Sequence, residues 1–297
     1  MVVGKCEYLN GVSMKDRSRL PAWLKVRFPA GAEYVQMKGL LRGAALHTVC
    51  EEAHCPNIGE CFASGTATFL ILGGVCTRNC SFCAVASGQP ASADTSEPER
   101  VALAVRQLGL RHAVITSVTR DDLPDGGARI FADTITSIRE QSPDCRIEVL
   151  VPDFRGSIEA LREVMTASPD ILGHNVETVP RLYPEVRPQA SYTRSLGVLK
   201  EAKRMCSNSL TKSGIMVGLG ETCDEIHQVL ADLEEIACEI ITIGQYLRPS
   251  AGHLPVARYY TPDEFQELKG FARGLGFRHV ESGPLVRSSY HAERALP

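Results

Sequence analysis

The chain has 297 residues, of which 44% are hydrophobic and 23% charged, and its formal net charge is −3. This composition is typical of a folded globular protein and excludes a disordered or fibrous chain. The small net charge argues against a protein that binds nucleic acid in bulk. No apolar stretch reaches the roughly 20 residues that span a bilayer, and residues 1–20 lack the apolar segment of a secretory signal. We therefore expect a soluble, cytoplasmic protein that binds neither nucleic acid nor membrane.

The sequence predicts three regions. Residues 1–66 are rich in turn residues and contain one helix-like stretch, "EYVQMKGLLRGAALHTVC". We expect them to form an N-terminal extension that lies across one end of the main domain, residues 67–282. That domain begins with "ATFLILGGV" (67–75), whose continuous apolar run predicts a buried strand. Residues 283–297 are too few for a domain, and we interpret them as a tail that covers the site.

Strands and helices alternate through the main domain. Three helices are predicted to begin with a capping box, in which Ser or Thr is followed three residues later by Glu: Ser96 with Glu99, Thr222 with Glu225, and Thr261 with Glu264. We count six strand-then-helix units. Strands connected through helices imply a parallel sheet with right-handed crossovers.

The apolar strands leave two closures open, because both an open doubly wound sheet and a full or partial barrel bury parallel strands on both faces. Polar residues at or just past the strand ends favour a barrel, since side chains from several units could then converge on one face. These residues are Ser117, Arg120, Asp121, Asn175, Glu177, Glu221, Gln245 and Arg248. We predict an α/β fold with a partial barrel of six β/α units.

A first group of cysteines, Cys76, Cys80 and Cys83, lies in "VCTRNCSFC" directly after the first strand. Close-spaced thiolates select zinc or an iron–sulfur cluster. A zinc site would need a fourth ligand, and the next His or Cys along the chain is His112. A zinc knuckle or unrelated thiols remain an alternative, but a cluster with one iron lacking a protein ligand fits the spacing better. The total of eleven cysteines is odd, which argues against a disulfide framework.

This CxxxCxxC spacing, with Phe82 before the last cysteine, resembles the signature of the radical S-adenosylmethionine superfamily. The resemblance implies a full or partial β/α barrel and a 4Fe-4S cluster on the three cysteines. It also implies that the amino and carboxylate groups of S-adenosylmethionine bind the open iron. Electron transfer to the bound cofactor then yields a 5′-deoxyadenosyl radical.

A second group, Cys50, Cys55 and Cys61, lies in "VCEEAHCPNIGECF" (49–62) with the spacing CxxxxCxxxxxC. A zinc site, or one cluster shared by all six cysteines, would be an alternative. Six thiolates around one cluster would leave two unused, however. We therefore favour two separate clusters.

Several stretches together resemble the lipoyl synthase family, and they cover nearly the whole chain. In order they are "RLPAWLKVRFPAG", "LHTVCEEAHCPNIGECF", "CTRNCSFC", "TSVTRDDLPDGGA", "GHNVET", "SGIMVGLGET", "QYLRPS" and "VRSSYHA". The resemblance implies that Cys50, Cys55 and Cys61 hold an auxiliary 4Fe-4S cluster in the N-terminal extension. It also implies a fourth ligand from the RSSY motif, either Ser288 or Ser289, and we predict Ser289. Without the resemblance we would interpret this segment as a polar tail.

The resemblance further implies the reaction and its partners. Two sulfur atoms are inserted at C6 and C8 of an octanoyl group on a lysine, and the auxiliary cluster donates them. The octanoyl group is carried by the lipoyl domains of 2-oxoacid dehydrogenase complexes or by the glycine-cleavage H protein. A ferredoxin or flavodoxin would supply electrons, and an iron–sulfur carrier protein would rebuild the cluster. Our candidates for contacts with S-adenosylmethionine are Ser117, Asn175, Glu177 and Arg194.

Two other functions stay open at this level. A biotin-synthase-like or methylthiotransferase reaction belongs to the same superfamily, but the terminal RSSY motif argues against it. A zinc-binding structural or adaptor module belongs to another class. Iron content distinguishes it from the enzyme, because two 4Fe-4S clusters would give about eight irons per chain.

Overall fold

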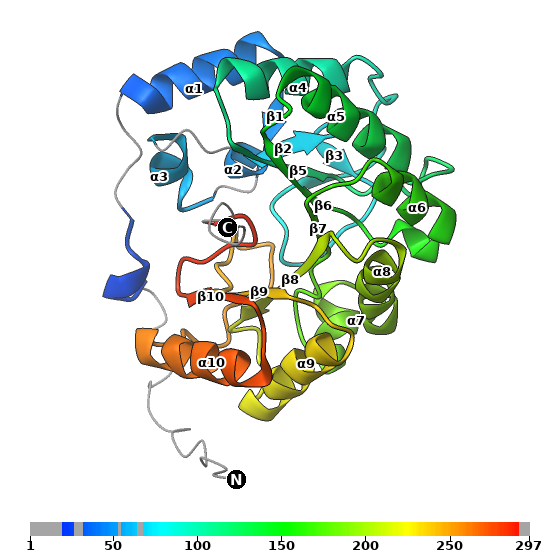
Figure 1. Cartoon of the computed structure of the whole chain (residues 1–297). Coiled ribbons are helices and arrows are strands. Elements are labelled where there is room, and N and C mark those ends of the chain that lie inside the picture. The colour runs from blue at the N-terminus through cyan, green and yellow to red at the C-terminus, as the bar shows by residue number, and fades with distance from the viewer. Residues whose placement is uncertain (1–19, 27–31, 53–54, 64–67, 291–297) are drawn as a thin grey trace.

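The structure is a computed structural model that describes residues 20–26, 32–52, 55–63 and 68–290. Within these ranges, one curved sheet of eight strands has the order β1-β2-β5-β6-β7-β8-β9-β10, and helices cover its convex face (Figure 1). Its strands are β1 (His47–Thr48), β2 (Thr68–Ile71), β5 (His112–Ser117), β6 (Arg146–Leu150), β7 (Ile171–Gly173), β8 (Leu210–Val217), β9 (Ile240–Gln245) and β10 (His279–Gly283). A separate pair, β3 (Val75–Cys76) and β4 (Ala86–Ser87), flanks the loop of the first cysteine group.

The α-helices in the described ranges are α1 (Ala32–Gly43), α2 (Val49–Glu52), α3 (Ile58–Ala63), α4 (Glu97–Gln107), α5 (Ala128–Gln141), α6 (Ile158–Thr166), α7 (Tyr183–Val186), α8 (Tyr192–Met205), α9 (Cys223–Glu235) and α10 (Pro262–Leu275). The same described ranges also contain three short 3-10 helices: η1 (Ala22–Leu24), η2 (Phe154–Gly156) and η3 (Pro180–Leu182).

The predicted partial barrel is confirmed. All neighbouring strands from β2 to β10 pair in parallel, and only β1 joins β2 in the antiparallel direction. Within the described residues no ladder of hydrogen bonds connects β1 to β10, so the sheet curves without closing. Because the strands are parallel, their carboxyl ends meet at one rim, where side chains from successive loops can converge.

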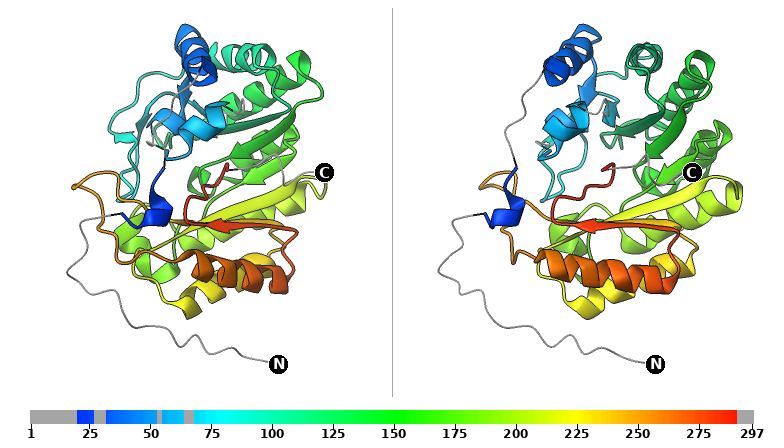
Figure 2. Two further views of the ribbon diagram at one scale, coloured as in Figure 1. Left: turned by 90° about the vertical axis from the view of Figure 1, so that its left-hand side faces the viewer. Right: turned by 60° about the vertical axis from the view of Figure 1, so that its left-hand side comes forward.

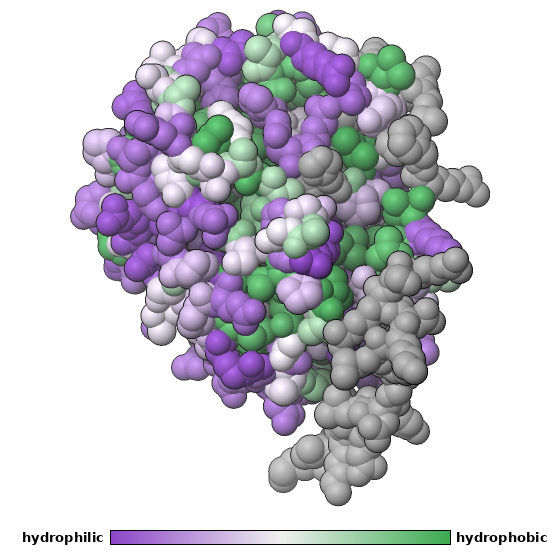
Figure 3. Space-filling model, turned by 180° about the vertical axis from the view of Figure 1, so that it is seen from behind, coloured by the Kyte–Doolittle hydropathy of each residue, from purple (hydrophilic) through white to green (hydrophobic). Residues whose placement is uncertain are grey.

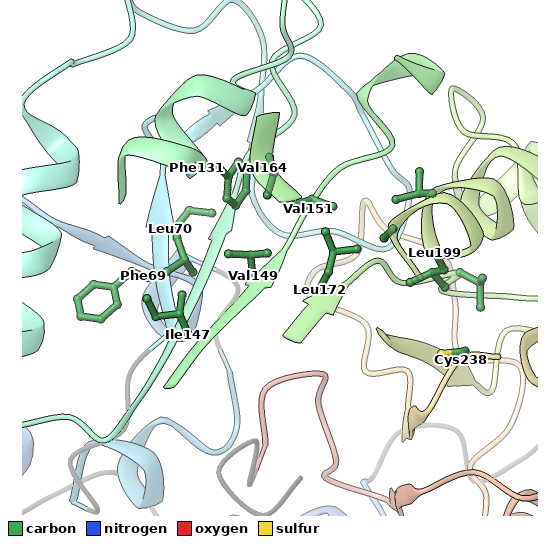
Figure 4. Packing of buried hydrophobic residues seen from close by; sticks show 14 of the residues in the cluster. Phe69, Leu70, Phe131, Ile147, Val149, Val151, Val164, Leu172, Leu199 and Cys238 are labelled. Carbon is green, nitrogen blue, oxygen red and sulfur yellow. The ribbon is translucent and has the colours of Figure 1, made fainter. Parts of the chain in front are cut away.

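The core lies between the sheet and the outer helices. Phe69 of β2 and Ile147 and Val149 of β6 are fully buried, and they belong to one apolar cluster with Phe131 of α5 and Val164 of α6 (Figure 4). This packing explains why the strand sequences are apolar on most positions, since residues outside the barrel face helices. Burial of apolar surface on this scale is the main stabilising term of such a fold.

The predicted helix starts are partly correct. Thr222 with Glu225 and Thr261 with Glu264 form complete capping boxes at the start of α9 and α10. The box predicted at Ser96 is wrong, although Ser96 does precede α4. Its hydroxyl donates to the Asp94 carboxylate at 2.7 Å and accepts from Arg100. A local carboxylate has therefore taken the hydroxyl away from the helix backbone.

The surface carries no element suited to a bilayer in the part of the chain that the structure describes: each of its helices is too short or too polar to cross one. Hydrophilic side chains cover much of the face shown in Figure 3, with apolar groups visible toward its centre. Beyond β10, the described C-terminal segment turns back onto the concave side of the sheet (Figure 2). It thereby approaches α3 and β2, which lie more than 200 residues earlier in the sequence.

Candidate iron–sulfur and cofactor site

The loop of the first cysteine group follows β2 at the rim of the barrel, and separate segments hold it there. The backbone N–H of Thr77 donates to Thr119 O at 3.0 Å, and that of Ser81 donates to Val186 O at 2.9 Å. On the other side, the ring of His253 is hydrogen-bonded to Cys83 O at 2.9 Å. The loop is thus fixed by three parts of the chain: the segment after β5, helix α7 itself, and the segment after β9.

Arg78, between Cys76 and Cys80, is the centre of a buried charge network. Its guanidinium donates to both carboxylate oxygens of Asp121, at 2.7 and 2.9 Å, and to Asp153 at 2.6 Å. Asp153 also accepts from Arg194 at 3.1 Å. The Asp153 side chain is fully buried and that of Arg78 is 5% exposed. The network ties the cysteine loop to the ends of β5 and β6 and to α8.

The thiols of Cys80 and Cys83 keep their protons at neutral pH when no metal is bound. Burial raises the pKa of Cys80 and of Cys83 to about 11, and the negative charge of Glu177 acts in the same direction on both. Binding of iron must therefore displace protons from these thiols.

Two of the predicted cofactor contacts have buried polar atoms with no hydrogen-bond partner among the described residues, Ser117 Oγ and Asn175 Oδ1. Ser117 ends β5, and Asn175 follows β7. Buried polar atoms are rarely left unpaired in native proteins. Both atoms are therefore available to a polar ligand at the rim of the barrel.

Glu177 has a strained backbone with φ of 65°. Its backbone pairs with β8, donating to Gly214 O at 3.0 Å and accepting from Met216 N at 2.8 Å. Its side chain accepts from Asn175 at 3.0 Å. Burial raises the pKa of Glu177, although the charge of Arg187 opposes this. Non-glycine residues held in this region of φ cluster at functional sites.

The other polar residues at the strand ends mostly serve the loops themselves. Arg120 pairs with Asp122 at 2.9 Å, and Gln245 donates to three backbone carbonyls. Glu221 accepts from the backbone of Gly218 at 2.6 Å and from the hydroxyl of Tyr260 at 2.9 Å. Arg194, one of the four predicted cofactor contacts, is engaged with Asp153 as described above.

The second group of cysteines lines a cavity with about 280 Å³ of empty space, part of it open to solvent. Its lining residues come from three distant segments: Cys50, Cys55, Asn57, Cys61, Thr68, Arg287, Ser289 and Tyr290. Ser289 is thus brought beside all three cysteines, whereas Ser288 does not line the cavity. Burial raises the pKa of Cys50 to about 11 and also raises that of Cys55, which the charge of Arg287 opposes.

The C-terminal segment is anchored over this cavity at several points. Asn57 donates to Leu285 O at 2.7 Å, and the Tyr290 hydroxyl donates to the Glu60 carboxylate at 3.2 Å. Gly244 of β9 allows the C-terminal segment to pass close to the sheet, because a Cβ atom at this position would lie 2.1 Å from Val286 O. Only glycine leaves room for the segment at this point.

Sequence reasoning missed Thr68, Asn57 and the network of Arg78. Arg287 and Tyr290 belong to the RSSY motif, which could have suggested them. Thr68 carries no such signal, because a threonine at the start of a strand is ordinary. Its hydroxyl donates to Ser289 Oγ at 2.8 Å, across 221 residues of sequence.

The donor type of the two cysteine groups can be matched to a class of metal centre. In the ranges that the structure describes, no three His, Cys, Asp or Glu side chains are grouped as a single metal ion would require. Each group supplies three soft thiolates, the donor type of iron–sulfur clusters. The second group adds a hydroxyl oxygen in the same cavity. The donors present therefore fit a 4Fe-4S cluster in each place.

Comparison with known proteins identifies the class. Residues 70–233 match the sequence model of the radical SAM superfamily. SuiB of Streptococcus suis bound to S-adenosylmethionine has a similar structure, with a TM-score of 0.58 and 12% identity over 89% of this chain and 62% of that one. Methylornithine synthase (PylB) has a TM-score of 0.54 and 14% identity over 72% of this chain and 70% of that one. These two likenesses concern the fold alone.

The chain is therefore a radical SAM enzyme, and superfamily membership implies a 4Fe-4S cluster and S-adenosylmethionine as cofactors. Residues 7–55 match the N-terminal domain of lipoyl synthase. Lipoyl synthase of Rubrobacter xylanophilus is 59% identical over 96% of this chain and 89% of its own length. That of Caldanaerobacter subterraneus is 58% identical over 94% of this chain and 97% of its own length. The chain belongs to the lipoyl synthase family, which confirms the resemblance and excludes the zinc adaptor.

Proposed function

We propose that this enzyme inserts sulfur at C6 and C8 of a protein-bound N6-octanoyl-lysine to form N6-lipoyl-lysine. Family membership implies an octanoylated carrier protein as substrate. The observation that carries the proposal is the gathering of Ser289 with Cys50, Cys55 and Cys61 around one cavity. A cluster that is dismantled during the reaction needs one ligand that is easily given up. The alkoxide of a serine suits this role, because it is a harder ligand for iron than a thiolate.

In this proposal the two cysteine groups have different roles. Cys76, Cys80 and Cys83 would hold the resident cluster, which would leave one iron for S-adenosylmethionine. When bound, this pair supplies a 5′-deoxyadenosyl radical, which can abstract hydrogen from an unactivated C–H bond that acid–base chemistry cannot attack. The protein positions the cofactor and excludes water. The second cluster is a substrate, since its sulfide ions become the two sulfur atoms of the product.

The rim residues are proposed to position the cofactor. Ser117 Oγ and Asn175 Oδ1 are buried and available, and either can bind the polar groups of S-adenosylmethionine. Glu177 follows β7 and is bridged to Ile215 of β8, and its carboxylate can accept hydrogen bonds from ribose hydroxyls or from the amino group. Arg194 would have to share its guanidinium between Asp153 and the cofactor carboxylate.

The remaining partners follow from the family and the sequence. We propose octanoylated lipoyl domains of 2-oxoacid dehydrogenase complexes and the glycine-cleavage H protein as substrates. A ferredoxin or flavodoxin would reduce the first cluster, and an iron–sulfur carrier protein would rebuild the second. The bacterial cytoplasm remains the predicted location. We retain the division into an extension (1–66), a barrel (67–282) and a tail (283–297) as a proposal.

Two cysteine substitutions test the roles. Cys50→Ala should still cleave S-adenosylmethionine to 5′-deoxyadenosine but form no lipoyl product, because only the sulfur donor is lost. Cys80→Ala should do neither. Ser288→Ala is the matched control for the tail and should keep both activities. If Cys50→Ala still made lipoyl groups, the second cysteine group would not hold the sulfur donor.

A further inference from the structure

Thr68 lines the cavity of the second cysteine site and is bonded to Ser289 there. It is the first residue of β2, pairs with Val114 of β5 and is 4% exposed. Its hydroxyl donates to Ser289 Oγ at 2.8 Å, and it lines the same cavity as Cys50. One strand residue thus lies at the cavity that proposed ligands from both ends of the chain line.

The hydrogen bond from Thr68 constrains how Ser289 can face the cavity. A serine hydroxyl has one hydrogen and two lone pairs. One lone pair accepts from Thr68, so the other lone pair and the hydrogen remain for the cavity that the three cysteines line. The strand start is rigid because β2 is buried between β1 and β5. The oxygen of Ser289 is therefore oriented by the sheet and not by the C-terminal segment alone.

We propose that Thr68 is a positioning residue for the serine ligand of the auxiliary cluster. It holds Ser289 Oγ in place for iron and keeps donating a hydrogen bond to that oxygen while it is bound. Partners that orient a metal ligand typically contribute ten- to hundredfold in metal affinity. The inference rests on the proposed function, since it needs a second cluster in this cavity.

A comparison of two substitutions isolates the hydroxyl. Thr68→Val has nearly the same shape and removes only the donor, whereas Thr68→Ser keeps the donor and removes a methyl group. Thr116→Val is the matched control, because Thr116 is also a buried strand threonine, 6% exposed, and donates at 2.8 Å to Leu150 O instead of to a ligand. Cys50→Ala serves as the reference for a protein with one cluster.

Each protein is reconstituted anaerobically with iron and sulfide and desalted, and its iron content is measured. Loss of iron to a ferrous chelator is then followed in time. Wild type should hold about eight irons and Cys50→Ala about four. In Thr68→Val, about four irons should stay bound while the others leave at least about tenfold faster than in wild type. Thr68→Ser and Thr116→Val should release iron as wild type does.

Other outcomes overturn the inference. Wild-type release from Thr68→Val would show that the hydrogen bond does not support the ligand. Equal loss of iron from Thr68→Val and Thr116→Val, or loss from both clusters, would mean that only the fold was damaged. Loss in Thr68→Ser as fast as in Thr68→Val would assign the effect to the methyl group. If Cys50→Ala itself held about eight irons, the proposed function would fail, independently of Thr68.

Discussion

Arg78→Met should destabilise the protein strongly, because it removes the central cation of the network beneath the first cysteine loop. Among the described residues, the fully buried Asp153 would keep one charged partner, Arg194, whose side chain is 36% exposed, and the backbone N–H of Arg155 at 3.0 Å. Removing one partner of a buried ion pair costs about 3–5 kcal/mol. Since one charged partner remains, we expect a loss of about 3 kcal/mol in the free energy of unfolding at pH 7.

The pKa of Asp153 gives an independent magnitude and a pH dependence. Burial alone would raise it, but the hydrogen bond and charge of Arg78 outweigh burial and hold the pKa at about 2. Against an ordinary value of about 3.9, this corresponds to roughly 2–3 kcal/mol. Because the folded-state pKa is the lower one, this stabilisation is complete above about pH 4 and is lost as the pH falls toward 2.

The assay is urea-induced unfolding of the cluster-free protein, followed by circular dichroism at pH 7 and at several values between pH 4 and pH 3. The difference between wild type and Arg78→Met should be largest at pH 7 and narrow below pH 4. Arg129→Met is the control, because Arg129 binds Asp133 at 2.9 Å on an exposed helix face and should change little. A loss in Arg78→Met no larger than in this control, or one independent of pH, would refute the reasoning.

Three further substitutions test other parts of the account. Gly244→Ala would place a Cβ atom 2.1 Å from Val286 O and should therefore displace the C-terminal segment. The iron content after reconstitution should fall from about eight toward about four per chain, and an unchanged iron content would contradict this. Ser117→Ala should weaken the binding of S-adenosylmethionine about tenfold in equilibrium dialysis if its hydroxyl donates one hydrogen bond to the cofactor; unchanged binding removes Ser117 from the site. Lys212→Met should lower the free energy of unfolding by about 3–5 kcal/mol, because Lys212 Nζ lies 2.7 Å from the buried carboxylate of Glu148 and is its main partner. A loss below about 1 kcal/mol would contradict a buried ion pair.

The alternation of strands and helices was predictable because local signals agreed with the tertiary arrangement. The strands are apolar because a parallel sheet covered by helices is buried on both faces. The capping boxes at Thr222 and Thr261 are each formed within four consecutive residues, so the local sequence contains the whole signal. The box at Ser96 failed because Asp94 and Arg100 compete for the same hydroxyl. Capping rules consider only the residues inside the box and therefore miss such competitors.

The site was predictable where its residues form short motifs, and unpredictable where they meet only in the fold. Spacing alone indicated both groups of cysteines. The pairing of Arg78 with Asp153 joins residues 75 positions apart, and the bond of Thr68 to Ser289 joins residues 221 apart. Ser289 belongs to the RSSY motif, but the local sequences around Arg78, Asp153 and Thr68 give no sign of these contacts. The parallel sheet brings Asp153, just past the end of β6, beside the loop that carries Arg78, and the returning C-terminal segment brings Ser289 to the start of β2.

The most direct test of the central claim is the origin of the inserted sulfur. The protein should be reconstituted with sulfide enriched in a heavy sulfur isotope and given an octanoyl-lysine peptide, S-adenosylmethionine and a reductant, and the product read by mass. We predict a species with one and then two added sulfurs, both heavy, and no product from Cys50→Ala reconstituted in the same way. Product sulfur of natural isotope composition, or product from Cys50→Ala, would contradict the assignment of the second cluster as the donor.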